Sequence, residues 1–159
     1  MLFSTNQNKT TTCSTPNSGC CSPKPKGKET CPSCGKIAKG VLAKTVQALV
    51  TSNLENYEGF YYCTTPSCST VYFKEDTLLT QKDLKVIVGL KEGAKPATVC
   101  YCFEWTREKI EAQLKENGAC NALEDIKTKM ETIGCSCETI NPSGGCCLGD
   151  VGKVIKELQ

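Results

Sequence analysis

The sequence of 159 residues contains no histidine. Histidine is the usual general base near neutral pH and a very common nitrogen ligand for metals. Without it, conventional hydrolytic catalysis is disfavoured, and a tightly bound metal must rely mainly on cysteine, with carboxylate or backbone oxygen as further ligands. We therefore expect a protein that is not a conventional enzyme.

Long apolar runs and a strong charge of one sign are also missing. No apolar stretch approaches the roughly 20 residues that cross a bilayer, and residues 1–10 lack the charged and then apolar pattern of an export signal. The 19 Lys and Arg nearly balance the 17 Asp and Glu, so the net charge of +2 indicates no nucleic-acid-binding surface. We expect a cytoplasmic protein without a membrane span or a nucleic-acid partner.

Cysteine, in contrast, occurs 14 times. A secreted protein stapled by disulfides would be short and would carry an export signal. A reducing compartment instead keeps thiols free to bind metals, and the sequence favours this interpretation. The cysteines fall into three groups, which lie in residues 1–29, 30–97 and 98–159.

Residues 1–29 are rich in Ser, Thr, Asn, Pro and Lys. Such a segment cannot bury enough apolar surface to offset the entropy cost of ordering, so we predict a disordered tail. It carries Cys13, Cys20 and Cys21. These thiols are either exposed side chains without a role or a flexible site that captures a soft metal ion.

Residues 30–97 contain two cysteine pairs with the spacing of a metal site. Cys31 and Cys34 form a Cys-x-x-Cys-Gly knuckle, and Cys63 and Cys68 are separated by four residues. If the pairs meet, four thiolates surround one ion, as tetrahedral structural zinc requires. We predict a zinc site with a structural role, and rubredoxin-like iron is the alternative.

Local patterns in the same region predict a small zinc-ribbon-like β/α domain. Aromatic and β-branched residues at 59–63 and 70–73 favour a hairpin whose turn holds the second cysteine pair. Thr45 is the predicted N-cap of a short helix over about 46–53. Alternating apolar residues at 84–88 favour a further strand.

Residues 98–159 predict a short helical domain. A helix over 107–117 begins behind Thr106, and a second helix begins at Asn121 and ends near residue 132. After a cysteine-rich loop, apolar spacing predicts a terminal helix. The predicted fold class is therefore α+β, with the zinc-binding domain followed by the helical domain.

The cysteines of the helical domain have the pattern of an iron–sulfur site, which needs thiolate ligands on loops. Cys100 and Cys102 lie just before a predicted helix and fit one iron of a [2Fe–2S] centre. The other iron takes two sulfurs from Cys135, Cys137, Cys146 and Cys147. Spacing alone does not decide between them. Cys120, at a helix junction, is expected to be a small buried apolar side chain.

Four blocks follow one another along the chain: Cys31-Pro-Ser-Cys34-Gly, Tyr-Tyr-Cys63-Thr-Thr-Pro-Ser-Cys68-Ser-Thr-Val-Tyr-Phe, Val-Cys100-Tyr-Cys102-Phe and Asn141-Pro-Ser-Gly-Gly-Cys146-Cys147-Leu-Gly-Asp. Together they resemble the N-terminal region of CopZ-type copper chaperones. The helical domain alone is also similar to bacterioferritin-associated ferredoxin, whose second cysteine pair is Cys-x-x-Cys.

The CopZ resemblance implies a zinc ion on the first half of the chain and a [2Fe–2S] cluster on the second. The implied zinc ligands are Cys31, Cys34, Cys63 and Cys68. The implied cluster ligands are Cys100, Cys102, Cys137 and Cys147. Cys135 is the main competitor for one of the last two positions, and Cys146 is a further one.

The same resemblance implies a protein that receives copper for an export ATPase, with one-electron reduction of Cu(II) to Cu(I) as an associated reaction. Two-domain relatives continue into a copper-binding domain with a Met-x-Cys-x-x-Cys loop, and these 159 residues contain no such loop. Soft-metal capture is then expected at Cys13, Cys20 and Cys21 or at spare thiols near the cluster. The alternative function is a [2Fe–2S] electron-transfer protein that docks on a redox partner without metal transfer.

Overall fold

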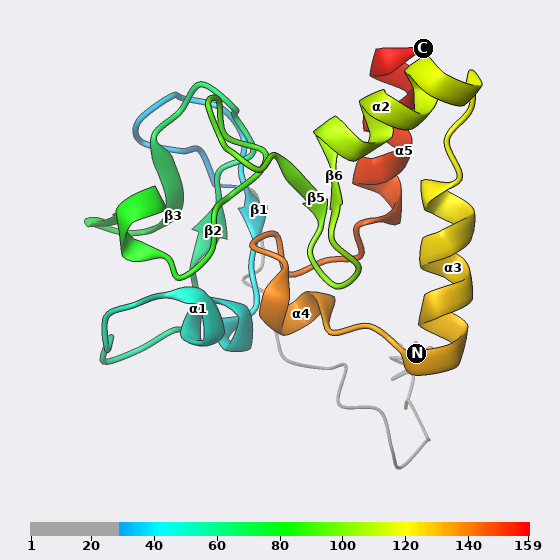
Figure 1. Ribbon diagram of the computed structural model, residues 1–159. Coiled ribbons are helices and arrows are strands. Elements are labelled where there is room, and N and C mark those ends of the chain that lie inside the picture. The colour runs from blue at the N-terminus through cyan, green and yellow to red at the C-terminus, as the bar shows by residue number, and fades with distance from the viewer. Residues whose placement is uncertain (1–28) are drawn as a thin grey trace, which may run out of the picture.

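The structure is a computed structural model that describes residues 29–159. The predicted tail thiols Cys13, Cys20 and Cys21 lie outside the described residues. In the described part, a four-stranded and a two-stranded antiparallel sheet combine with five α-helices (Figure 1). This arrangement confirms the predicted α+β fold class.

The first half of the described chain is built around the four-stranded sheet, in the order β1-β2-β3-β4. Its strands are β1 (Lys39–Gly40), β2 (Tyr61–Tyr62), β3 (Thr70–Lys74) and β4 (Thr77–Thr80). Tyr61 of β2 pairs with Phe73 of β3, and their rings stack, so the predicted hairpin is confirmed. No apolar alternation predicts β4, because Leu79 is its one buried residue.

Helix α1 (Ala43–Leu49) begins earlier than the predicted helix over 46–53. Thr45 is not its N-cap but a fully buried residue inside it. The helix ends at Leu49 because Val50 is extended and forms a β-bridge with Leu84. The predicted cap and the predicted end are therefore both wrong. Val46 packs into the core of the sheet, and Thr45 is buried against residues 138–144, so burial rather than capping determines this helix.

The predicted strand over 84–88 is also wrong. Residues 84–88 form no strand and follow a short 3-10 helix, η1 (Gln81–Asp83). The Gln81 side chain donates to the Val86 carbonyl and accepts from the Val88 amide, both at 2.7 Å. These side-chain hydrogen bonds satisfy backbone groups that a strand would pair with a neighbouring strand.

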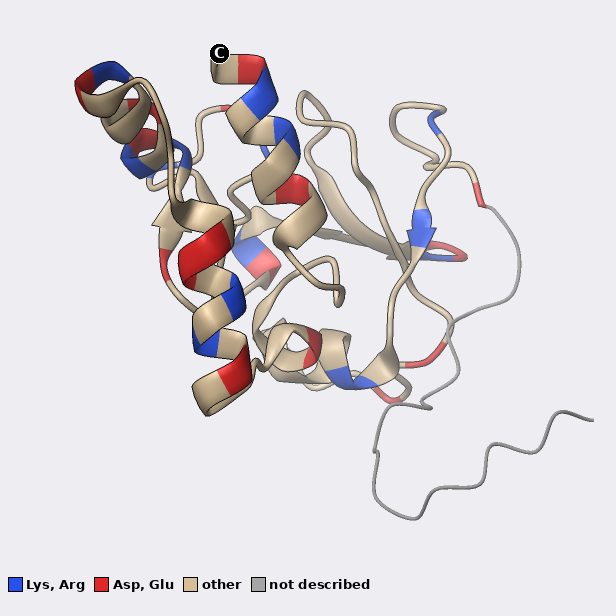
Figure 2. Cartoon of the chain, turned by 90° about the vertical axis from the view of Figure 1, so that its right-hand side faces the viewer, with Lys and Arg blue, Asp and Glu red and all other residues tan. Residues whose placement is uncertain are grey.

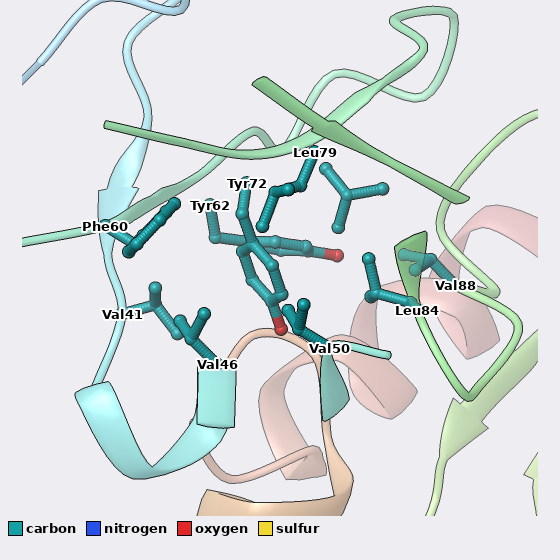
Figure 3. Packing of buried hydrophobic residues seen from close by; sticks show 10 residues of the cluster. Val41, Val46, Val50, Phe60, Tyr62, Tyr72, Leu79, Leu84 and Val88 are labelled. Carbon is teal, nitrogen blue, oxygen red and sulfur yellow. The ribbon is translucent and has the colours of Figure 1, made fainter. Parts of the chain in front are cut away.

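The core of this half lies between the sheet, α1 and the segment after η1 (Figure 3). Its buried members are Val41, Val46, Val50, Phe60, Tyr62, Val71, Tyr72, Leu79, Leu84 and Val88. Tyr72 is fully buried at its centre. A second, smaller cluster packs around the cysteines at the other face of the sheet and includes Ala38 and Phe73.

The second half contains a hairpin and four helices: β5 (Thr98–Cys100), β6 (Trp105–Thr106), α2 (Arg107–Asn117), α3 (Ala122–Ile133), α4 (Cys137–Ile140) and α5 (Leu148–Leu158). α2, α3 and α5 confirm the three predicted helices. Thr106 caps α2 as predicted, since its hydroxyl accepts from the Lys109 amide. The hairpin and α4 are too short to produce a periodic pattern, and no sequence signal predicts them.

The long helices converge on a core that contains cysteine. Ile110, Ile126 and Val151, one from each long helix, are fully buried in one cluster with Cys100 and Cys147. In Figure 1, α3 and α5 lie beside the hairpin, while α4 lies between the hairpin and α1. The cysteine side chains therefore lie where the helices meet.

Basic and acidic side chains both occur along α2, α3 and α5, so neither sign dominates these helices (Figure 2). Of the helices in residues 29–159, none is long and apolar enough to cross a membrane.

Candidate metal centres

The knuckle at Cys31 and Cys34 is a tight turn closed by its own backbone. The Gly35 amide donates to the Cys31 carbonyl at 2.8 Å, and the Cys31 amide donates to the Lys36 carbonyl at 2.9 Å. Gly35 has a φ of 70°, which a residue with a Cβ adopts only at a cost. The Cys-x-x-Cys-Gly pattern thus forms the turn that it predicts.

The loop between β2 and β3 supplies Cys63 and Cys68. The Cys68 amide donates to the Thr65 carbonyl at 3.2 Å. Lys91, from a later segment, donates through Nζ to the carbonyls of Cys63 and Thr65 at 3.0 and 2.9 Å. Sequence patterns do not identify Lys91 as part of the site, because only the fold brings it to this loop.

The structure brings the four predicted zinc ligands together as the first thiol group: Cys31, Cys34, Cys63 and Cys68. Their Sγ atoms all lie within 4.8 Å of one another. The Cys31–Cys68 separation is 3.9 Å and the Cys34–Cys63 separation is 3.7 Å. Tetrahedral zinc with Zn–S bonds of about 2.3 Å requires S–S separations of about 3.8 Å. The donor set therefore fits a zinc ion.

Local contacts give two members of the first thiol group different pKa values. Hydrogen bonding to the Thr65 hydroxyl, and then to the Lys36 backbone, lowers the pKa of Cys34 to about 6. Burial raises the pKa of Cys63 to about 12. A metal ion must displace the proton from such a buried thiol, so metal binding by this group releases protons.

The second thiol group consists of Cys100, Cys102, Cys137 and Cys147. Cys100 ends β5 and Cys102 lies in the turn of the hairpin, so both precede α2 as predicted. Cys137 is the first residue of α4, and Cys147 immediately precedes α5. Cys102 is half-buried and the other three are buried.

The closest contacts of the second thiol group join its two segments. The Sγ atoms of Cys102 and Cys137 are 3.6 Å apart, and the Ser136 amide donates to the Cys102 sulfur at 3.3 Å. Hydrogen bonding to Cys147 lowers the pKa of Cys100 to about 7 and that of Cys137 to about 5. The same contacts raise the pKa of Cys147, and burial raises that of Cys102 to about 12.

This arrangement differs from a cage for one ion. Within residues 29–159, no further group of three or more Cys, Asp or Glu ligand atoms gathers as the first thiol group does. The second thiol group instead presents adjacent pairs of thiols. Ser136, whose amide lies against one of these sulfurs, has no sequence signal that marks it as part of a site.

Three described cysteines belong to neither group. Cys135 and Cys146 are exposed, although each lies close in the chain to a member of the second thiol group. Cys120 is half-buried against the helical core. All eleven described cysteines are free of disulfides.

Comparison with known proteins gives consistent results. The zinc binding domain family of CopZ proteins matches residues 28–85, which include all four members of the first thiol group. The copper chaperone CopZ of Archaeoglobus fulgidus is 37% identical over 119 residues, which is 74% of this chain and 57% of that protein. The X-ray structure of the Archaeoglobus fulgidus CopZ N-terminal domain superposes with a TM-score of 0.68 at 34% identity, covering 79% of this chain and 97% of that one.

The fold and the first thiol group define a cysteine-rich α+β protein with a four-cysteine zinc-binding site. The chain belongs to the family of CopZ N-terminal domains, which confirms the resemblance that the four sequence blocks indicate. It spans about 57% of the length of the curated relative that it matches.

Proposed function

We propose that this chain is an iron–sulfur metallochaperone-like protein. In this proposal the second thiol group binds a [2Fe–2S] cluster, and the protein handles a soft metal ion, copper, for transfer to an export ATPase. The observation that carries the proposal is the second thiol group, in which three buried thiols and one half-buried thiol lie apart from the zinc site in a chain of the CopZ family.

The closeness of the four sulfurs supports a cluster with two irons. A [2Fe–2S] cluster needs four thiolates, two on each iron. Cys102 lies 3.6 Å from Cys137, and Cys147 contacts both Cys137 and Cys100. The Ser136 amide that donates to the Cys102 sulfur resembles the backbone donors that stabilise cluster sulfurs.

Exposure argues for Cys137 and Cys147 over their competitors as ligands. These two side chains are 6% and 1% exposed, whereas Cys135 and Cys146 are exposed. A cluster at the junction of β5, α4 and α5 contacts the buried thiols. The exposed pair then remains available for another ligand.

That ligand is the copper cargo. When bound and reduced by an external one-electron donor, a [2Fe–2S] cluster would supply the one electron that converts Cu(II) to Cu(I). Cu(I) prefers soft thiolate ligands, and Cys135 and Cys146 lie beside the second thiol group. The tail thiols Cys13, Cys20 and Cys21 are further candidates for capture. This chemistry suits a reducing, cytoplasmic compartment.

Metal analysis and spectroscopy of anaerobically purified protein test the proposal. We expect one zinc, two irons and two sulfides per chain, with the visible and EPR spectra of a [2Fe–2S] cluster. After reduction, addition of Cu(II) should bleach the reduced EPR signal and leave protein-bound Cu(I) in the presence of a competing chelator. Zinc in both thiol groups without sulfide would refute the cluster.

The same experiment separates the alternative, an electron-transfer protein without metal transfer. That protein would show the cluster but no tight Cu(I) binding. Its docking face could include the half-buried aromatic residues near Cys102. Of these, Trp105 donates to Asp125 at 2.8 Å, and Phe103 packs against the helical core.

A further inference from the structure

We propose that the zinc-binding half of the chain positions both cysteine segments of the second thiol group, through the hydroxyls of Tyr72 and Tyr101. This inference rests on the proposed cluster at that group. It assigns a role to the closed zinc site, since zinc would stabilise the part of the fold that holds the cluster ligands in position. Tyr72 and Tyr101 are then positioning residues rather than ligands.

Tyr72 links the core of the sheet to the loop between Cys137 and Cys147. It is a fully buried residue of β3, and its hydroxyl donates to the Pro142 carbonyl at 2.6 Å. Figure 3 shows the Tyr72 ring crossing the core, with its oxygen at the loop that follows α4. A residue of the zinc-binding half therefore holds the middle of the segment that carries two proposed ligands.

The 137–147 loop is itself ordered by polar contacts. Asn141 is 5% exposed; its amide nitrogen donates to the Gly145 carbonyl at 2.9 Å, and its Oδ1 accepts from the Ser143 amide at 3.0 Å. Thr45 of α1 donates to the Glu138 carbonyl. Movement of this loop away from the zinc-binding half would break the hydrogen bonds from Tyr72 to Pro142 and from Thr45 to Glu138.

Tyr101 performs the corresponding role for the hairpin. It stands between Cys100 and Cys102, and its hydroxyl accepts from the Gly89 amide at 2.8 Å and donates to the Ile87 carbonyl at 3.0 Å. Gly89 approaches so closely that a Cβ there would lie 2.0 Å from the Thr98 carbonyl oxygen. The first pair of proposed ligands is thus fixed to the segment 87–89.

That segment continues directly to the zinc site. Lys91 donates to the carbonyls of Cys63 and Thr65, and the Glu92 amide donates to the Pro66 carbonyl at 3.0 Å. Hydrogen bonds at both ends of segment 87–92 therefore connect the loop that carries Cys63 and Cys68 to Tyr101.

Replacement of single hydroxyls tests the inference with little change in packing. We would prepare Tyr72→Phe and Tyr101→Phe, with Tyr62→Phe as the matched control. Tyr62 is buried opposite Tyr72 in the same sheet, and within residues 29–159 its hydroxyl makes no hydrogen bond to either cysteine segment. Iron, sulfide and zinc contents, EPR line shape and the rate of iron release to a chelator would be measured on each protein.

We expect Tyr72→Phe and Tyr101→Phe to keep zinc and the wild-type circular dichroism, but to release iron about tenfold faster, as for loss of other outer-shell contacts, with altered EPR line shapes. The control should match the wild type. Wild-type release rates and spectra in both variants, an equal effect in Tyr62→Phe, or loss of zinc together with iron would each overturn the positioning role. Wild-type protein that holds zinc but no iron or sulfide would instead refute the proposed function.

Discussion

The two thiol groups of this chain use the same side chain in different ways. The first thiol group gathers four sulfurs within 4.8 Å of one another, and its members come from a knuckle and a hairpin loop of one small sheet. The second thiol group gathers sulfurs in pairs, from a hairpin turn and from the ends of two helices. The first arrangement fits a single tetrahedral ion, and the second fits a centre with more than one metal.

The two groups also differ in whether further cysteines lie beside them. The first group has four thiols and no spare one, so a bound zinc has no open position and stabilises the fold. The second group is flanked by the exposed Cys135 and Cys146. Under the proposed function, the metal of the closed site would support structure, and the metals of the second thiol group would take part in chemistry.

The largest effect should follow from breaking the first thiol group. We expect Cys63→Ser to lose zinc and to lower the free energy of unfolding by several kcal/mol, because the binding free energy of structural zinc, on the order of 10 kcal/mol in small zinc modules, is folding free energy. Zinc content and urea unfolding measure it. Cys120→Ser, at a half-buried thiol outside both groups, is the control, and equal destabilisation by both changes would contradict a closed structural site.

A second prediction separates ligands from spare thiols in the second thiol group. Cys137→Ser should remove most of the iron and sulfide while zinc stays at one per chain, since the two sites share no ligand. Cys135→Ser should keep both metals. Iron, sulfide and zinc per chain, with the visible spectrum, give the answer. If Cys135→Ser loses the cluster and Cys137→Ser keeps it, the assignment of these two cysteines is reversed.

Gly144 tests how tightly the cysteine loop sits on the zinc-binding half. Its φ is 66°, and a Cβ there would lie 2.8 Å from Oγ1 of Thr45. Gly144→Ala should therefore cost about 1–2 kcal/mol from the backbone conformation alone, and the displaced loop should release iron faster than zinc. Urea unfolding and metal release measure both effects.

The control for this change is Gly149→Ala in α5, where a Cβ would meet nothing within 4 Å. An alanine in a helix is favoured over glycine by up to about 1 kcal/mol, so this variant should be slightly more stable. If Gly144→Ala is as stable as Gly149→Ala, the loop is not held against α1.

The features that the sequence predicts correctly are those determined locally. The Cys-x-x-Cys-Gly knuckle, the aromatic hairpin and the helix behind Thr106 each depend on residues close together in the chain, and the structure has all three. The start of α1 is mispredicted because burial against the loop between Cys137 and Cys147 outweighs the capping preference of Thr45. The predicted strand at 84–88 fails because the Gln81 side chain takes its hydrogen bonds.

In the candidate sites, too, the sequence does not predict the residues that only the fold brings together. Spacing identifies the four cysteines of the first thiol group, but it does not find Lys91, which fixes their second loop from a distance of 26 to 28 positions. Spacing also leaves four late cysteines as candidates for the second group. Burial, a property of the folded chain, is what distinguishes Cys137 and Cys147 from Cys135 and Cys146.

The smallest predicted effect concerns helix α2, which carries no member of either thiol group. Helix α2 buries a single residue, Ile110, so its side-chain cap should contribute measurably to its stability. Thr106→Ala removes the hydroxyl that accepts from the Lys109 amide at 3.2 Å and should cost about 1 kcal/mol in urea unfolding. Asn121→Ala is the control at the start of α3, where the cap side chain makes no such hydrogen bond, and it should change stability less. Because α1 has no side-chain cap and depends on burial, a cost in Thr106→Ala that exceeds the control would show that α2 depends on local capping where α1 does not.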